Sequence, residues 1–359
     1  MLGEVRCQYS SSLGVSQVGL GKRILLGMPQ RLFFSEIKQQ LEAYGFEVIG
    51  IPYPDDFKYS SFGDRLYNCF RKVFLFDNKY KTYLKYRDTG AKTRSIIKNI
   101  LKPVDYALII SMDYFPDDAL KLIKEKSKVL IGYQWDGLDR YPLARDLISL
   151  FDRFFVFDPK DLKEEGILPT TNFYLPTKLV NVTADIDVYY IGSFVKSRMK
   201  VINELAHYLD GTGARSVIKV FSKKPEVIDK YKDSPLEIIE EYISYEQNLA
   251  YVSRSRTIVD ILNKVHCGLS FRVFEALGND KKLITDNQNI ANYDFYDPSN
   301  IFIIRDLNFE GLEEFIASPY KPLDPLIKEK YSFGNWIKHI LGIQPHIPIS
   351  LPDLNSSSV

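Results

Sequence analysis

The chain has 359 residues, 45% hydrophobic and 26% charged, and its 47 Lys and Arg nearly balance 46 Asp and Glu to give a net charge of +1. This composition is typical of a soluble globular protein with room for two domains of roughly 150 residues each. Three widely separated cysteines argue against a disulfide framework and a thiolate zinc site, and no apolar run is long enough to span a bilayer. We therefore expect a cytoplasmic protein without integral membrane segments.

The chain order of apolar patterns predicts an α/β fold with two tandem Rossmann-like domains. We expect a loosely ordered leader (1–20), a first domain (21–180), a second domain (181–330), a terminal helix (331–345) that packs back toward the first domain, and a frayed tail (346–359).

The first domain shows a repeated strand, helix, strand pattern. Ser35 is the expected N-cap of its first helix. Strand patterns occupy 22–29, 46–53, 105–112, 128–136 and 153–159, and helical patterns occupy 35–45 and 116–126. The second domain repeats this rhythm, with strands at 187–194, 216–222, 256–261, 281–287 and 300–306 and helices at 197–209, 245–255 and 268–278.

Residues 57–102 interrupt this rhythm. They hold twelve Lys and Arg against three Asp, a local excess of nine positive charges, interleaved with many Phe and Tyr. Such a segment fits a surface that meets anionic phospholipid or a polyprenyl-diphosphate-linked acceptor. The alternative is a solvated helical hairpin with an aromatic core. Nucleic-acid binding ranks third, because no nucleic-acid-binding motif accompanies the charge.

One strongly apolar segment of the second domain carries Asp260, Arg272 and Glu275. Ser270 is a good N-cap for the helix that follows, and helical spacing places Gly268, Arg272 and Glu275 on one polar stripe. The helix N-terminus and Arg272 can neutralise phosphate oxygens, and the Glu275 carboxylate can accept both hydroxyls of a ribose. The alternative is an ion pair on an exposed helix face.

The segment "VDILNKVHCGLSFRVFEALGNDKKLITDN", with "NYDFYDPSNI" after it, resembles the C-terminal signature of bacterial cell-surface polysaccharide glycosyltransferases of the GT-B fold. It is most similar to the CgeB-like group of lipopolysaccharide and capsule biosynthesis. The specific match covers about residues 240–305, and the two-domain layout facing a cleft extends it loosely to the whole chain. The resemblance implies that Glu275 binds the donor ribose, that Arg272 faces the diphosphate, and that no metal or cofactor is needed.

The loop before this helix carries further candidate donor contacts, each with an alternative role. His266 stands where relatives often carry Gln, so donor choice stays open, and a loop His can equally be a surface residue. Lys264 is a further expected donor contact. Asp260 either orients the loop and approaches the donor sugar or caps backbone amides at the strand end.

A second phosphate-binding turn is expected at Gly192, which lets backbone amides approach phosphate while Ser193 and Arg198 donate hydrogen bonds. The chain has neither GxGxxG nor GxxxxGK[ST], which argues against a nicotinamide enzyme and a P-loop ATPase. Asp185 and Asp187 precede a strand, so we reject them as a metal site.

The resemblance implies that the first domain holds the acceptor. Asp113 and Asp136 lie just past predicted strand ends, and an inverting transferase needs a base there to take the acceptor proton. Asp136 is the first choice because Trp135 beside it offers a surface for sugar stacking, and Asp113 is the second. Each is alternatively a loop-capping Asp, and a retaining mechanism needs no such base.

The resemblance, together with these patterns, predicts a cytoplasmic, metal-independent glycosyltransferase in which residues 57–102 either contact the inner face of the plasma membrane or form a solvated helical hairpin. Its donor is a nucleotide-sugar, with a UDP-sugar favoured, and its acceptor is a surface polysaccharide or a polyprenyl-linked glycan. The alternatives are a nucleotide-sugar epimerase of the same fold and a noncatalytic glycan- or membrane-binding protein.

Overall fold

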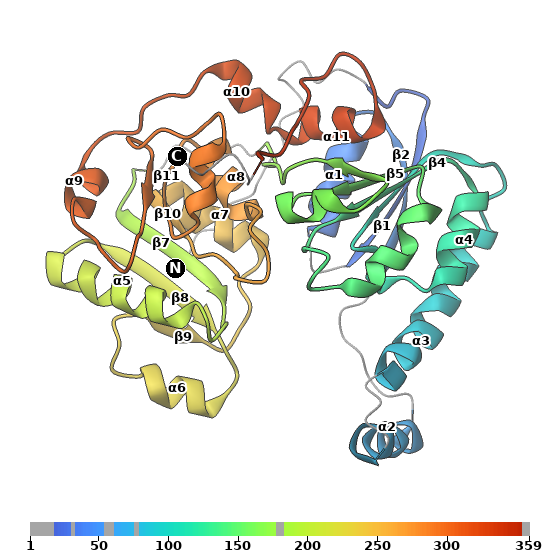
Figure 1. Ribbon diagram of the computed structural model, residues 1–359, viewed down its shortest axis with the longest axis horizontal. Helices are drawn as coiled ribbons and strands as arrows, with labels where there is room; N and C mark the ends of the chain where they lie inside the picture. The colour runs from blue at the N-terminus through green and yellow to red at the C-terminus, as the bar shows by residue number, and fades with distance from the viewer. Residues whose placement is uncertain (1–17, 30–32, 54–60, 75–78, 177–182, 354–359) are drawn as a thin grey trace.

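The computed structural model describes residues 18–29, 33–53, 61–74, 79–176 and 183–353. Most of the expected leader, residues 177–182 at the boundary between the two expected domains and the end of the tail lie outside these residues. The described chain forms two six-stranded, fully parallel sheets, one in each half of the molecule (Figure 1). The prediction of two tandem α/β domains is confirmed.

The first sheet has the strand order β2-β1-β3-β4-β5-β6. Its strands are β1 (Arg23–Pro29), β2 (Glu47–Tyr53), β3 (Val104–Ile110), β4 (Ser127–Gln134), β5 (Arg153–Val156) and β6 (Ile167–Pro169). The helices are α1 (Phe34–Ala43), α2 (Phe62–Phe74), α3 (Lys79–Lys98) and α4 (Asp117–Glu125), with short 3-10 helices η1 (Met112–Tyr114), η2 (Pro142–Leu150) and η3 (Pro159–Lys163). Alternate residues of β1 face opposite layers: Ile24 packs with α1, and Leu25 packs with α3 and α4.

The second sheet has the order β12-β11-β10-β7-β8-β9. Its strands are β7 (Ile186–Ser193), β8 (Ser216–Phe221), β9 (Glu237–Ile239), β10 (Ser255–Asp260), β11 (Lys282–Thr285) and β12 (Ile301–Ile303). The helices are α5 (Met199–Thr212), α6 (Pro225–Tyr231), α7 (Tyr245–Arg254), α8 (Phe271–Gly278), α9 (Leu312–Ala317) and α10 (Pro325–Lys330), with η4 (Gln288–Asn292). Helices α5 and α9 cover one face, and α7 and α8 cover the other.

The strand order of the second sheet reverses between β7 and β10, which are hydrogen-bonded neighbours. At such a reversal the loops that leave the two strands turn to opposite faces of the sheet and open a crevice between them. The carboxyl ends of β7 and β10 carry Gly192, Ser193 and Asp260. The topology therefore brings two of the sequence-predicted segments together.

The last helix, α11 (Phe333–Leu341), joins the layer of α1 on the first sheet (Figure 1). Trp336 is fully buried there and contacts Phe173, with ring centroids 4.3 Å apart. The described part of the tail is packed as well, unlike the frayed end we expected. Ile349 is 3% exposed, and the Ile347 amide donates to Asn335 Oδ1 over 2.7 Å, so apolar tail residues cover the end of this layer.

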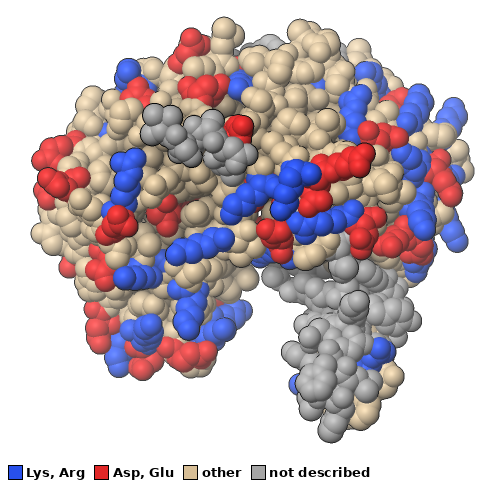
Figure 2. Space-filling model, in the orientation of Figure 1, with Lys and Arg blue, Asp and Glu red and all other residues tan. Residues whose placement is uncertain are grey.

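The basic aromatic insertion forms α2 and α3, apart from 57–60 and 75–78, which lie outside the described residues. Helix α2 lies at the end of the molecule, away from both sheets (Figure 1). Elsewhere, Lys and Arg are interspersed with Asp and Glu over the visible face of both domains (Figure 2). Of the helices that the structure describes, none is both long and apolar enough to cross a membrane.

The start of α1 differs from the prediction. The helix begins at Phe34, and its N-cap is Phe33, which has a left-handed backbone (φ 55°) and no capping side chain. Ser35 lies inside the first turn, where its hydroxyl donates to Glu36 Oε2 over 2.8 Å. The prediction of Ser35 as the N-cap is therefore wrong.

Candidate active site

A cleft of about 580 Å³ lies between the two domains. The first domain contributes Phe33, Ser35, Glu36 and Trp135 to its walls. The second domain contributes the ends of β7 and β10 and the first turns of α7 and α8. Three loops of the second domain therefore converge on one space that the first domain covers.

Most of the residues predicted to bind the donor line this cleft. They are Gly192, Ser193, Arg198, Asp260, Ser270, Arg272 and Glu275, together with Trp135 from the acceptor side. Five candidates are not among its lining residues: Asp113, Asp136, Lys264, His266 and Gly268.

Helix α8 starts at the edge of the cleft. Ser270 is its N-cap, as predicted: the hydroxyl oxygen accepts the Arg272 amide over 3.2 Å, and the hydroxyl donates to Asp260 Oδ1 over 2.8 Å. Asp260 thus orients the cap. Gly268 precedes the helix and cannot share its polar stripe; a Cβ there would lie 2.5 Å from the Phe157 carbonyl, so Gly268 allows close packing on the first domain.

Glu275 is 3% exposed although it borders the cleft. Its Oε1 accepts from Asn248 Nδ2 over 2.8 Å, and its Oε2 lies 3.7 Å from Arg272 Nη1. Burial raises the pKa of Glu275, opposed by the Arg272 charge and the Asn248 hydrogen bond. The alternative of an ion pair on an exposed helix face is excluded, because the carboxylate is buried.

Asn248 was missed by the sequence analysis. Its Oδ1 accepts from the hydroxyl of fully buried Tyr189 over 3.1 Å, so a chain of hydrogen bonds runs from Tyr189 through Asn248 to Glu275. The available signal was the capping box that begins α7, in which Ser244 and Gln247 bond each other's backbone amides. That box places Asn248 one turn into a helix whose start opens on the cleft.

Two arginines supply the positive charge of the cleft. Arg198 is the N-cap residue of α5, and Arg272 is in the first turn of α8. Arg198 Nε and Arg272 Nη1 are buried nitrogens with no hydrogen-bond partner among the described residues. Arg272 Nη1 lies 3.7 Å from Glu275 Oε2, beyond hydrogen-bond distance. Buried guanidinium nitrogens that make no hydrogen bond suit an anion with several oxygens.

Gly192 belongs to β7 and does not form a turn. A Cβ there would lie 2.5 Å from the hydroxyl oxygen of Tyr190, so the glycine makes room for that side chain. Burial raises the pKa of Tyr190, against the opposing charge of Arg198. In this structure Gly192 therefore makes room for the Tyr190 side chain, which lies in the field of the Arg198 charge.

Aromatic side chains join the two domains at the cleft. Phe33 of the first domain stacks on Phe271 with centroids 4.5 Å apart and meets Tyr245 edge-on at 4.8 Å. Trp135 also stacks on Phe271, at 6.1 Å. The sequence analysis predicted only Trp135 of this group, because aromatic residues in core-like segments gave no sign that they would face a ligand.

A flat apolar wall lies at the far side of the cleft. Phe221 and Tyr242 stack with centroids 3.7 Å apart, and Ile239 and Ile243 lie beside them. Tyr242 is 61% exposed. An exposed ring backed by a second ring is a surface on which a planar heterocycle can stack.

The two carboxylates predicted on the acceptor side differ in environment. Asp136 pairs with Arg140 over 2.8 Å. Asp113 accepts from Gln134 Nε2 over 3.2 Å, and burial raises the pKa of Asp113 to about 6, with the Asp136 charge adding to the shift. A pKa close to neutrality suits a general base.

The loop residues His266 and Lys264 are not among the residues that line the cleft. His266 is 8% exposed and packs edge-on against Phe157 at 5.2 Å, and burial lowers its pKa. Lys264 is exposed. The structure thus places His266 between the domains and outside the lining of the cleft.

Asp185 and Asp187 bind arginines. Asp185 pairs with Arg254 at 2.5 Å, and Asp187 pairs with Arg215 at 2.9 Å. Within the described residues, no group of three His, Cys, Asp or Glu is arranged to hold a metal ion.

No protein-family model matches the chain, and no curated protein matches it. Among solved structures, it is similar to a glycosyltransferase from Rickettsia africae (11% identity, TM-score 0.43, 82% of this chain and 87% of that chain). It is also similar to LpCGTa in complex with UDP (10% identity, TM-score 0.42, 89% of this chain and 97% of that chain). A third similar structure is the GtfA/B complex (9% identity, TM-score 0.41, 71% of this chain), and this chain spans only 59% of the length of that one. At these identities and TM-scores the likeness assigns no activity, and the proposal below rests on the residues of the cleft.

Proposed function

We propose that the protein is a glycosyltransferase that moves a sugar from a nucleotide-sugar, a UDP-sugar first, to a surface-polysaccharide or lipid-linked glycan. The observation that carries the proposal is the buried Glu275 carboxylate one turn inside α8, with Arg272 beside it and Arg198 in the lining of the same cleft; Arg198 Nε and Arg272 Nη1 have no hydrogen-bond partner among the described residues. A carboxylate in a cleft with two cations and a helix N-terminus matches a ribose followed by a diphosphate.

The remaining walls suit the other parts of such a donor. The stacked Phe221 and Tyr242 accept the base, Glu275 accepts the ribose hydroxyls, and Arg198 and Arg272 bind the phosphates. The sugar then lies toward Trp135 and Phe33 of the first domain. When the acceptor oxygen attacks the anomeric carbon, the bond to the diphosphate breaks, and the two arginines stabilise the charge that develops on the leaving group.

The base that takes the acceptor proton is proposed to be Asp113 ahead of Asp136. A general base whose pKa lies near the working pH is ionised and still binds a proton well enough to take it from the acceptor. Burial raises the pKa of Asp113 to about 6, whereas Asp136 is paired with Arg140. Neither residue is among the lining residues of the cleft, so this assignment requires the acceptor to extend over the ends of β3 and β4.

Release of nucleoside diphosphate tests the proposal. Purified protein is incubated with a panel of nucleotide-sugars, with and without lipid-linked glycans, and Arg272→Ala is compared with Lys264→Ala, a matched removal of one cation outside the cleft. We expect acceptor-dependent release that falls by roughly two orders of magnitude in Arg272→Ala and is unchanged in Lys264→Ala. Conversion of the donor without acceptor would instead indicate an epimerase, and no turnover with no nucleotide affinity would indicate a noncatalytic protein.

We also propose that α2 brings the enzyme to the cytoplasmic face of an anionic membrane, where a lipid-linked acceptor resides. Phe62, Leu66 and Phe70 follow each other at i, i+4 spacing, and Phe62 is 73% and Phe70 48% exposed. The insertion around them carries the excess of nine positive charges. Exposed rings beside cations favour the interface of anionic phospholipid.

Vesicle sedimentation tests the membrane contact. Three proteins are mixed with phosphatidylglycerol or phosphatidylcholine vesicles: wild type, the double variant Phe62→Ser with Phe70→Ser, and the control Leu101→Ser. The control removes an apolar side chain that is 91% exposed at the end of the same insertion. We expect wild type and the control to sediment with the anionic vesicles and the double variant to stay in solution. Equal binding of all three proteins would contradict a contact through α2.

A further inference from the structure

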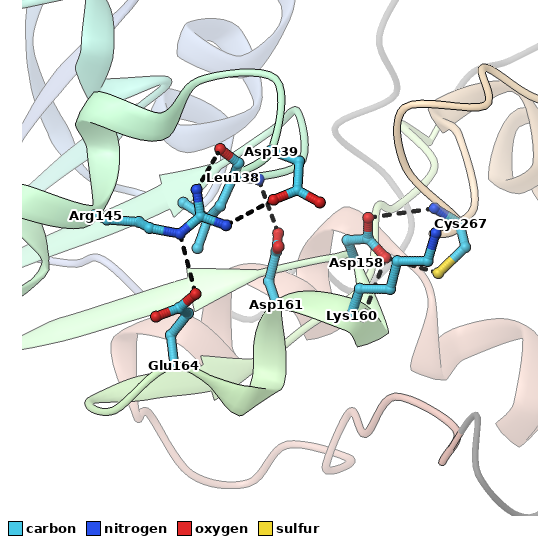
Figure 3. Close-up of polar contacts among 8 residues, drawn as sticks. All are labelled: Leu138, Asp139, Arg145, Asp158, Lys160, Asp161, Glu164 and Cys267. Atoms are coloured by element: carbon cyan, nitrogen blue, oxygen red, sulfur yellow. Dashed lines mark hydrogen bonds and ion pairs between the residues drawn. The ribbon is translucent and has the colours of Figure 1, made fainter.

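The segment 158–164, called the junction segment below, follows β5 and contains η3. At its start, Asp158 reaches across to the loop between β10 and α8 (Figure 3). Asp158 Oδ2 accepts the Cys267 amide over 3.2 Å, and Oδ1 accepts the Cys267 thiol over 2.9 Å. Asp158 is 2% and Cys267 5% exposed, so one carboxylate of the first domain holds the loop that leads into the N-cap of α8.

The junction segment also holds the loop after β4, on its other side (Figure 3). Asp161 Oδ2 accepts the Leu138 amide over 2.9 Å. Arg145, held by Glu164 at 3.0 Å, donates to the Leu138 carbonyl at 3.0 Å. Leu138 is thus fixed at both its amide and its carbonyl, two residues after Asp136.

The two loops pack against this segment and against each other. A Cβ at Gly137 would lie 3.1 Å from Asp158 Oδ2 and 3.2 Å from His266 Cβ. A side chain at residue 137 would therefore require Asp158 or the loop before α8 to shift. A shift of any one of them displaces the others.

Asp158 is also the N-cap of η3, where its Oδ1 accepts the Lys160 amide over 3.2 Å. Asp158 and Asp161 are both almost fully buried, and neither forms an ion pair among the described residues. Burial, with the nearby charge of Asp158, raises the pKa of Asp161 to about 6. Burial of both carboxylates costs free energy, which the backbone hydrogen bonds that they accept offset.

We propose that Asp158 and Asp161 are positioning residues that set the distance between the donor helix α8 and the acceptor-side loop that follows Trp135 across the domain junction. This inference rests on the proposed function. Asp158 acts through Cys267 on the approach to Ser270 and Arg272, and Asp161 acts through Leu138 on the loop that carries Asp136. Transfer depends on both, because reaction rates are sensitive to misplacement of reacting groups by 1 Å.

Hydrogen exchange of the full-length chain, read by peptide, tests the inference without a substrate. We expect Asp158→Ala to speed exchange in 262–269 and, because Asp158 Oδ1 also accepts the Lys160 amide, in the junction segment itself. We expect Asp161→Ala to speed exchange in 137–141. Each change is about tenfold, and peptides outside the two loops and the junction segment stay unchanged. Asp158→Asn keeps an oxygen for the Cys267 amide and restores most of the protection. Glu165→Ala is the control, since it removes an exposed carboxylate just after the junction segment and outside both loops.

Kinetics supply the second readout. The transfer rate kcat is expected to fall by about tenfold or more in both alanine variants. The nucleotide Kd stays within about threefold of wild type, because neither residue lines the cleft. Exchange that rises throughout both domains, exchange unchanged in both segments, or a nucleotide affinity that falls as much as kcat would overturn the inference. If wild type binds no nucleotide, the proposed function fails by itself, and the exchange pattern alone decides whether the junction segment holds both loops.

Discussion

Replacement of Asn248 by Ala removes the hydrogen-bond donor that holds the Glu275 carboxylate at 2.8 Å. A hydrogen bond to a charged group contributes about 1.5–3 kcal/mol, and about 1.4 kcal/mol corresponds to a tenfold change in affinity. The Asn248 hydrogen bond opposes the rise in the pKa of Glu275 that burial causes, so loss of this bond also favours protonation of Glu275. We therefore expect Asn248→Ala to weaken nucleotide binding by roughly tenfold or more.

Tyr189→Phe is the matched control for this variant. It removes the bond from the Tyr189 hydroxyl to Asn248 and leaves the bond from Asn248 to Glu275 intact. A neutral hydrogen bond contributes about 1 kcal/mol, so we expect a comparable loss of unfolding free energy and a nucleotide Kd within about threefold of wild type. Calorimetric titration and chemical denaturation measure the two quantities. Wild-type affinity in Asn248→Ala, or an equal loss in both variants, would refute the role of Asn248 in holding Glu275.

Three further predictions follow from the structure. Because Phe33 has a left-handed backbone, Phe33→Gly is expected to be more stable than Phe33→Ala by about 1 kcal/mol in chemical denaturation, and equal stabilities would contradict that backbone conformation. Because burial raises the pKa of Asp113 to about 6, a base at this position loses activity as pH falls through 6, and a transfer rate that stays flat down to pH 5 would rule Asp113 out. Trp336→Ala is expected to cost about 3–5 kcal/mol of stability, since α11 fills the core of the first domain, whereas a loss below about 1 kcal/mol would show that α11 is not needed there.

The alternation of strand and helix patterns sufficed to predict both sheets, because each buried strand is a compact apolar run with turn residues at its ends. Short elements gave no such pattern. Strand β9 spans only Glu237–Ile239 and helix α6 only Pro225–Tyr231, too few residues for a period to emerge. The left-handed backbone of Phe33 was equally hidden, because sequence reasoning assigns that conformation to Gly or Asn.

In the site, Arg272 and Glu275 were readable because both stand at fixed helical spacing from the cap at Ser270. Asn248 was not readable: it lies 27 residues before Glu275 on another helix, and the two meet because α7 and α8 pack on the same face of the second sheet. A loop that leaves a strand can turn toward the ligand or toward the adjacent domain, and the sequence does not decide which.

For the loop before α8, contacts with the first domain decide its direction. Asp158 binds Cys267, and Asn172 donates to the Leu269 carbonyl over 2.9 Å. These bonds draw His266 and Gly268 toward Phe157 and away from the cleft. Such long-range contacts explain why two of the predicted donor-binding residues lie outside its lining.

Calorimetric titration of UDP, GDP, CMP and ADP into wild type and Glu275→Ala tests the central claim most directly. The account predicts that one of these nucleotides binds the wild type and that Glu275→Ala loses most of that affinity, because the buried carboxylate accepts the ribose hydroxyls. The nucleotide that binds then identifies the class of donor sugars to test. Absence of binding by all four nucleotides, or equal binding by Glu275→Ala, would contradict the assignment of the cleft as a donor site.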